Sequence, residues 1–206
     1  MGAQEEEEAV KHMERARELD PQNPAAWNNL ANYYGHRSPV KKAFEYYAKA
    51  IELNPEESVY YQNLATSVFL FRKDAMEYYN IGEKQVFDRS LELYRKALKL
   101  DPNNFVLASD YAQAYYGIRP IRHNDALAAW EQALKIAGTD EQREGIYLHL
   151  ARIKLDAGRF DEVRAHLNNV TNAMFAELKK RLVRNLGERE NKSKETNAPP
   201  DTVEKK

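Results

Sequence analysis

The stretch PAAWNNLANYYGHRSPVKKAFEYYAKAIELNPEE, residues 24–57, decides the fold. Its first part places apolar and small side chains three and four positions apart, on one helical face: Trp27, Leu30, Ala31 and Tyr34. A second face follows with the same spacing: Ala43, Tyr47 and Ala50. Small side chains let two helix backbones approach closely, and aromatic ones fill the spaces around them. The stretch therefore predicts a hairpin of two helices, which Asn54-Pro55 ends.

The same pattern returns 34 residues later in the chain. The corresponding pairs are Trp27 and Tyr61, Leu30 and Leu64, and Ala31 and Ala65. This spacing is far longer than the helical period, so it indicates a repeated structural unit. The closing half of the second unit arrives 47 residues after that of the first, which indicates an insertion between its two helices.

These residues resemble the tetratricopeptide repeat: Trp27-x-x-Leu30-Ala31-x-x-Tyr34, then Ala43-x-x-x-Tyr47-x-x-Ala50-x-x-x-x-Pro55. The resemblance implies an all-α fold, a right-handed α-solenoid of helix hairpins over residues 4–187. Its expected parts are a half-repeat at 4–23, repeats at about 24–57, 58–104, 105–140 and 144–177, and a capping helix to 187. Residues 188–206 are polar and contain Pro199-Pro200, so we expect a disordered tail.

The half-repeat at 4–23 has two explanations. The chain is cut from a longer protein, which is our expectation, or the Glu-rich helix is a polar cap of the kind that solenoids need. We expect a cytoplasmic protein, with the periplasm as the alternative if an N-terminal signal or anchor has been removed.

In tetratricopeptide arrays the first helix of each hairpin lines a concave groove that binds peptides. The resemblance implies that these residues face the groove here: Asn28, Asn29, Asn32, Gln62, Asn63, Thr66, Ser109, Asp110, Gln113, His149 and Arg152. An Asn side chain both donates and accepts, so it can hold the N–H and C=O of a peptide unit. Asn29 and Asn63 repeat at the array period and resemble the asparagine ladders of some grooves. The alternative is that they are solvated surface.

One well-known groove of the family does not match this chain. Its clamp of Lys, Asn, Asn, Lys and Arg, which binds the C-terminal carboxylate of heat-shock chaperones, aligns with Asn28, Asn32, Asn63, Val106 and Asp110. Both Asn residues are kept, but every cation is missing, so a carboxylate has no strong partner there. We therefore expect no binding of such tails.

The insertion in the second repeat lies around residues 72–82 and contains an aromatic segment with a short helix predicted after Asp74. Insertions often lie on the binding side of a solenoid, so this one is a candidate lid or ligand wall. The alternative is that it buries Tyr78, Tyr79 and Phe87 against the third repeat.

Composition and motifs exclude several other classes. The chain has 31 Lys plus Arg against 32 Asp plus Glu and no Cys, so no overall charge draws it to nucleic acid, and thiolate chemistry is absent. It has no glycine-rich phosphate loop, His-Glu-x-x-His or Gly-x-Ser-x-Gly motif, so we expect no enzyme, cofactor or metal. Glu162 and His166 lie one helical turn apart, but two residues make an ordinary surface pair rather than a metal site.

The sequence therefore predicts a scaffold that binds an extended or helical segment of another protein. The alternatives are an RNA-binding helical repeat, or a regulatory domain cut from a larger enzymatic or envelope-associated protein. No membrane span is expected, and nucleic acid is not the expected partner. We expect a monomer. Self-association is the alternative, because residues 4–19 carry six Glu against three cations while 171–187 carry four cations against one Glu.

Overall fold

The computed structural model describes residues 3–37 and 39–196, with side chains for 7–37 and 39–194. The described residues form helices and turns without a strand, which confirms the predicted all-α class. The chain divides into two compact units after Ile121. This boundary falls inside the third predicted repeat, 105–140, so the pairing of the two helices of that repeat stays a prediction.

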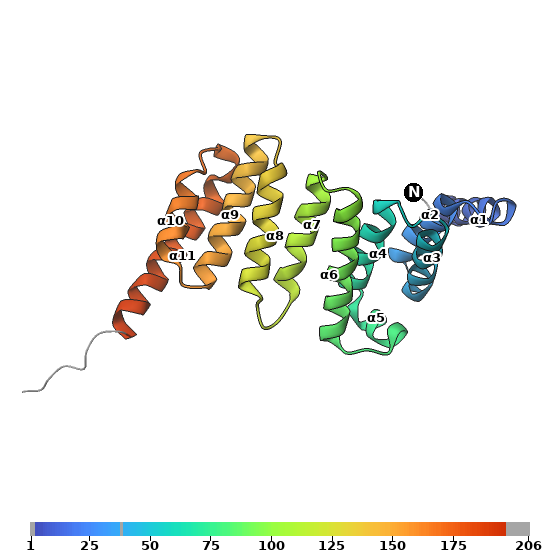
Figure 1. The fold of residues 1–206 in the computed structure, drawn as a ribbon, viewed down its shortest axis with the longest axis horizontal. Coiled ribbons are helices and arrows are strands. Elements are labelled where there is room, and N and C mark those ends of the chain that lie inside the picture. Colours follow the sequence, from blue (N-terminus) through green and yellow to red (C-terminus); the bar gives the residue numbers. More distant parts are fainter. Residues whose placement is uncertain (1–2, 38, 197–206) are drawn as a thin grey trace, which may run out of the picture. The chain divides into compact units, whose positions relative to one another are not determined.

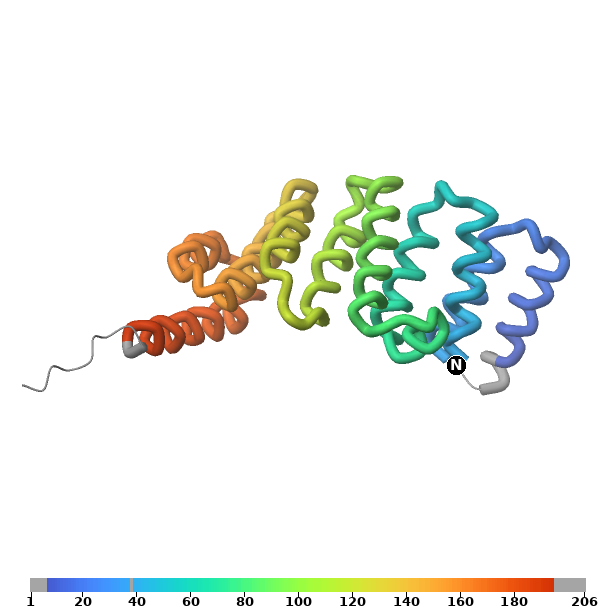
Figure 2. The backbone as a smooth tube through the Cα atoms, turned by 60° about the horizontal axis from the view of Figure 1, so that its bottom comes forward, coloured from blue at the N-terminus to red at the C-terminus, as the bar shows by residue number. Residues whose placement is uncertain are grey.

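The first unit is a series of helices in which consecutive elements lie side by side (Figures 1 and 2). They are α1 (Ala3–Leu19), α2 (Pro24–Gly35), α3 (Val40–Leu53), α4 (Ser58–Leu70), α5 (Arg72–Tyr79), α6 (Glu83–Leu100), α7 (Phe105–Ala114) and the short 3₁₀ helix η1 (Tyr115–Gly117). Helix α2 pairs with α3, and α4 pairs with α6. These are the first two predicted hairpins.

The first hairpin closes through the residues that the pattern singled out. Leu30, Ala31, Ala43 and Ala50 are completely buried. Burying an apolar side chain of the size of Leu in this way stabilises the fold by about 1.5–3 kcal/mol. Helix α2 begins at Pro24 because the side chain of Asn23 accepts a hydrogen bond from the Ala25 N–H, at 3.0 Å.

The insertion in the second repeat forms the separate helix α5. Asn80 ends this helix in the left-handed conformation, at φ 51°. The ring centroids of Tyr78 and Tyr79 lie 5.4 and 5.8 Å from that of Phe44 in α3. The prediction that these tyrosines pack against the third repeat is therefore wrong, because the buried ring of Phe44 in the first repeat supplies their apolar surface. Phe87 packs within the second repeat, 5.7 Å from Phe69.

The second unit contains a first helix, then a hairpin, and a long helix that packs against both helices of the hairpin. Its elements are α8 (His123–Ile136), α9 (Asp140–Asp156), α10 (Phe160–Asn168), the 3₁₀ helix η2 (Ala173–Phe175) and α11 (Ala176–Thr196). Helices α9 and α10 form the hairpin against which α11 packs. One buried cluster joins α9, α10 and α11: Leu148, Ala151, Leu155, Val163, Leu167, Val170 and Leu186. Helix α9 starts earlier than the predicted fourth repeat because Thr139 and Gln142 form a capping box.

The helix end predicted at Gly187, with disorder from 188, is wrong for residues 188–196. Helix α11 continues to Thr196. The guanidinium of Arg189 donates to the Leu155 carbonyl at 3.2 Å and to the Asp156 carboxylate at 2.9 Å, and Glu190 accepts from Arg164. These contacts with α9 and α10 hold the polar end of α11. The rest of the predicted tail, 197–206, lies outside the described residues.

Within the described ranges, no helix combines the length and the apolar character that crossing a bilayer requires.

We predict that Leu30→Ala lowers the free energy of unfolding by about 3 kcal/mol, because Leu30 is completely buried and the change leaves a cavity. The matched control is Leu19→Ala, since Leu19 is 69% exposed, and it should cost less than about 0.5 kcal/mol. Urea denaturation followed by circular dichroism measures both. Equal effects of the two substitutions would contradict the packing described for the first hairpin.

Candidate functional site

The first unit carries an open cavity of about 470 Å³. Its lining residues come from α4, α6, α7 and η1: Thr66, Phe69, Leu70, Tyr94, Asp110, Gln113, Ala114, Tyr116 and Gly117. Three of the predicted groove residues, Thr66, Asp110 and Gln113, are among them. Sequence reasoning missed the aromatic walls, because Phe69 and Tyr94 occupy positions that also fit a helix core.

Hydrogen bonds hold three polar residues of this cavity in place: Thr66, Tyr94 and Asp110. Gln62 Nε2 donates to Asp110 Oδ2 at 2.9 Å, which links α4 to α7. The hydroxyls of Thr66 and Tyr94 lie 2.8 Å apart and link α4 to α6. Burial raises the pKa of Tyr94 to about 12, so this hydroxyl keeps its proton at neutral pH.

A second pair of bonds extends this polar surface to α2. Asn63 Nδ2 donates to Asn28 Oδ1 at 3.0 Å, and the Tyr47 hydroxyl donates to Asn32 Oδ1 at 2.7 Å. Asn28 is buried, whereas Asn29 is exposed. The structural partner of Asn63 is thus Asn28, because Asn29 points toward solvent.

The remaining predicted groove residues of the first unit differ in their surroundings. Gln113 is exposed at the cavity. The Ser109 hydroxyl is buried and has no hydrogen-bond partner within the described part of the chain. The three positions aligned with clamp cations hold a buried Asn28 that accepts from Asn63, an exposed Val106, and an Asp110 that accepts from Gln62.

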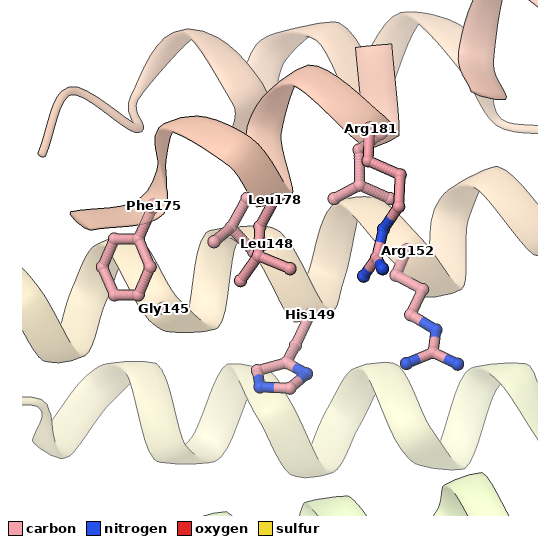
Figure 3. Close-up of a pocket in the computed structure, with 8 residues that line it drawn as sticks. Gly145, Leu148, His149, Arg152, Phe175, Leu178 and Arg181 are labelled. Carbon is pink, nitrogen blue, oxygen red and sulfur yellow. The ribbon is translucent and has the colours of Figure 1, made fainter. Parts of the chain in front are cut away.

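The last two predicted groove residues, His149 and Arg152, line a pocket of about 140 Å³ within the second unit (Figure 3). Its other lining residues come from α9, η2 and α11: Gly145, Leu148, Phe175, Leu178, Arg181 and Leu182. The His149 ring stacks on Trp130, with centroids 4.0 Å apart and planes 6° from parallel. Sequence reasoning missed the α11 side of this pocket, because the four-residue spacing of Leu178 and Leu182 indicated only a capping helix.

The pocket keeps His149 uncharged. Burial, together with the positive charge of Arg152, lowers the pKa of His149 to about 4. At neutral pH the charge at the pocket therefore comes from its arginines, and His149 presents a flat uncharged ring.

The predicted pair of Glu162 and His166 belongs to an ion-pair network. Lys154 Nζ lies 2.9 Å from Glu162 Oε2 and 2.8 Å from His166 Nε2. Hydrogen bonds from Arg159 and Lys154 lower the pKa of the Glu162 carboxyl to about 2. The ammonium of Lys154 thus occupies the place between the two residues. No group of three or more His, Cys, Asp or Glu side chains with metal-binding geometry occurs in the described residues.

Comparison with protein families and curated proteins finds similarity to tetratricopeptide-repeat proteins. Residues 24–57 match the family model described as a tetratricopeptide repeat. The chain is 26% identical over 136 residues to the TPR repeat-containing protein MJ1428 of Methanocaldococcus jannaschii. The match covers 66% of this chain and spans about a fifth, 21%, of that relative.

Solved structures agree with the fold. The chain superposes on MamA with a TM-score of 0.64 at 15% identity, covering 85% of this chain and 90% of MamA. It superposes on YrrB, described as a TPR protein with an unusual peptide-binding site, with a TM-score of 0.63 at 16% identity, covering 87% and 84%. For TTC0263, a thermophilic TPR protein of Thermus thermophilus, the TM-score is 0.58 at 23% identity, covering 88% and 90%. The predicted fold of helix hairpins is thereby confirmed.

We predict that His149 makes stability depend on pH. Its pKa is about 4 in the folded chain and near 6.5 when unfolded, so between these values the unfolded chain binds a proton that the folded chain does not. Stability should fall as the pH falls from 6.5 to 4, by roughly 3 kcal/mol from this group.

Urea denaturation across this pH range, compared between the wild type and His149→Gln, isolates the contribution. The free energy of unfolding of the variant should fall less steeply with falling pH than that of the wild type. The pH dependence that remains includes a contribution from His166, because burial lowers its pKa as well. An unchanged slope would contradict the buried, uncharged state of His149.

Proposed function

Because residues 24–57 are a tetratricopeptide repeat in a chain with the fold of tetratricopeptide-repeat proteins, we propose that this protein is a non-enzymatic scaffold that binds a segment of another protein. The segment, extended or helical, lies in the polar cavity of the first unit. One observation carries the proposal: hydrogen bonds hold polar side chains in place at the cavity and beside it. Thr66 and Tyr94 bond to each other within the lining, Asp110 of the lining accepts from Gln62, and Asn63 donates to Asn28 on the adjoining surface. A surface ordered before binding loses little entropy when a partner binds.

These bonds leave hydrogen-bonding capacity for a ligand. The bond from Asn63 to Asn28 uses one of the two N–H groups of Asn63 and leaves its carbonyl oxygen available. The exposed amides of Gln113 and Asn29 each offer a donor and an acceptor group as well. A backbone N–H and C=O of a peptide match such amides whatever the peptide's own side chains are.

The apolar walls supply the second part of recognition. Leu70 is 57% exposed, and Phe69 and Tyr116 are half-buried in the same cavity. Binding sites commonly combine apolar walls with a few placed polar groups, the first for affinity and the second for orientation. This cavity therefore suits a segment with an apolar side chain between two backbone contacts.

The similarity to YrrB supports binding of a peptide, since that protein is described as having a peptide-binding site. The proposal that the chain is not an enzyme is supported by its sequence, which lacks the common nucleotide-binding and hydrolase motifs.

The test uses the full chain as bait in a display selection of random peptides, followed by calorimetry of the selected peptides. We predict that Asn63→Ala combined with Gln113→Ala weakens their binding about tenfold or more, because two hydrogen bonds to the ligand are lost. The matched control is Asn103→Ala, which removes an exposed amide in the turn between α6 and α7.

Circular dichroism of each variant checks that the fold is kept. Selected peptides that bind the double variant and the control equally would overturn the proposal for this cavity.

A further inference from the structure

The pocket of the second unit has the size of one side chain. It measures about 140 Å³, and four of its lining residues are apolar: Leu148, Phe175, Leu178 and Leu182. An apolar cavity of about 150 Å³ holds a benzene ring, whereas sites for drug-sized ligands measure about 300–1,000 Å³. The pocket therefore fits a single aromatic or branched side chain that belongs to a larger partner.

The charge at the pocket is positive. Its lining residues include two cations, Arg152 and Arg181, and no anion. Both arginines are exposed, and Figure 3 shows the Arg181 guanidinium reaching from α11 toward His149 and Arg152 on α9. Two arginines from two different helices thus line the same apolar pocket. A carboxylate placed there offsets the charge of both.

The other polar residue of the pocket adds no charge. His149 is neutral at physiological pH, and its ring is held flat against Trp130. A ring held in this way provides a rigid, uncharged surface beside the two cations.

We propose that this pocket binds an acidic peptide segment of another protein. One aromatic or branched apolar side chain of the segment enters between α9 and α11, and an adjacent carboxylate contacts Arg152 and Arg181. This proposal deepens the proposed function. It rests on that function in one respect, namely that the partner is a protein. It adds a site in the second unit and the chemistry of what that site recognises.

The probe is a synthetic peptide with the core Asp-Glu-Phe-Asp-Glu between Gly-Ser flanks. Two further peptides replace Phe by Ala, or every Asp and Glu by Asn and Gln. Binding to the full chain is followed by NMR of the leucine methyl groups. The acidic Phe peptide should shift the signals of Leu148, Leu178 and Leu182, which line the pocket.

Each half of the ligand should contribute. Replacing Phe by Ala should weaken binding about tenfold, from the lost apolar burial. Neutralising the acids, or the double variant Arg152→Gln with Arg181→Gln, should weaken it about tenfold through the lost charge-assisted contacts. The matched control is Arg184→Gln, an exposed arginine of α11 outside the lining, which should change binding less than about twofold.

Three results would overturn the inference: no methyl shifts with the acidic Phe peptide, equal binding of the neutral peptide, or equal binding to the double arginine variant. A fourth comes from sedimentation. A concentration-dependent dimer that the double arginine variant abolishes would assign the pocket to a second copy of this chain. The Asn63→Ala and Gln113→Ala variant of the first unit should bind the acidic peptide normally, so failure here is distinguishable from failure at the groove.

Discussion

The close approach of paired helix backbones is the constraint on which the first unit depends. Ala31 and Ala43 are completely buried between α2 and α3, and a Cβ on Gly35 would meet the Tyr47 hydroxyl at 3.4 Å. In the next hairpin the buried Ser90 hydroxyl donates to the Ala65 carbonyl at 2.9 Å. Such contacts fix how each helix is rotated about its axis and how far it is shifted along that axis, because larger side chains would force the backbones apart. The polar faces of α2, α4 and α7 follow from that placement.

Once the helices are fixed, their polar residues bond to one another across elements. Asn28 with Asn63 and Gln62 with Asp110 join side chains that lie 35 and 48 positions apart in the chain. Partly buried polar groups need such partners, because an unsatisfied donor or acceptor costs about 1–3 kcal/mol. The same bonds that stabilise the fold also order the surface that a ligand would meet, so stability and recognition depend on one network.

The two candidate surfaces differ in chemistry, and their predictability from sequence differs as well. The first combines polar side chains with aromatic walls, and its residues Thr66, Asp110 and Gln113 could be inferred because the repeat period places them on the first helix of each hairpin. The second required α11. Arg181 lies far from His149 in sequence and outside any recognised repeat, so no spacing rule connects the two residues, and only the packing of α11 on α9 brings Arg181 to that pocket.

The sequence by itself determined the all-α class and the hairpins of the first two repeats, because small and aromatic residues at helical spacing, repeated at 34 positions, have few other ways to be buried. Tertiary structure decided what lies between and beyond them. It placed the insertion helix α5 against Phe44 and carried α11 past Gly187 through the contacts of Arg189. The physical reason is that helical periodicity encodes which face of a helix is buried, whereas the element that buries it is chosen by contacts between residues distant in the chain.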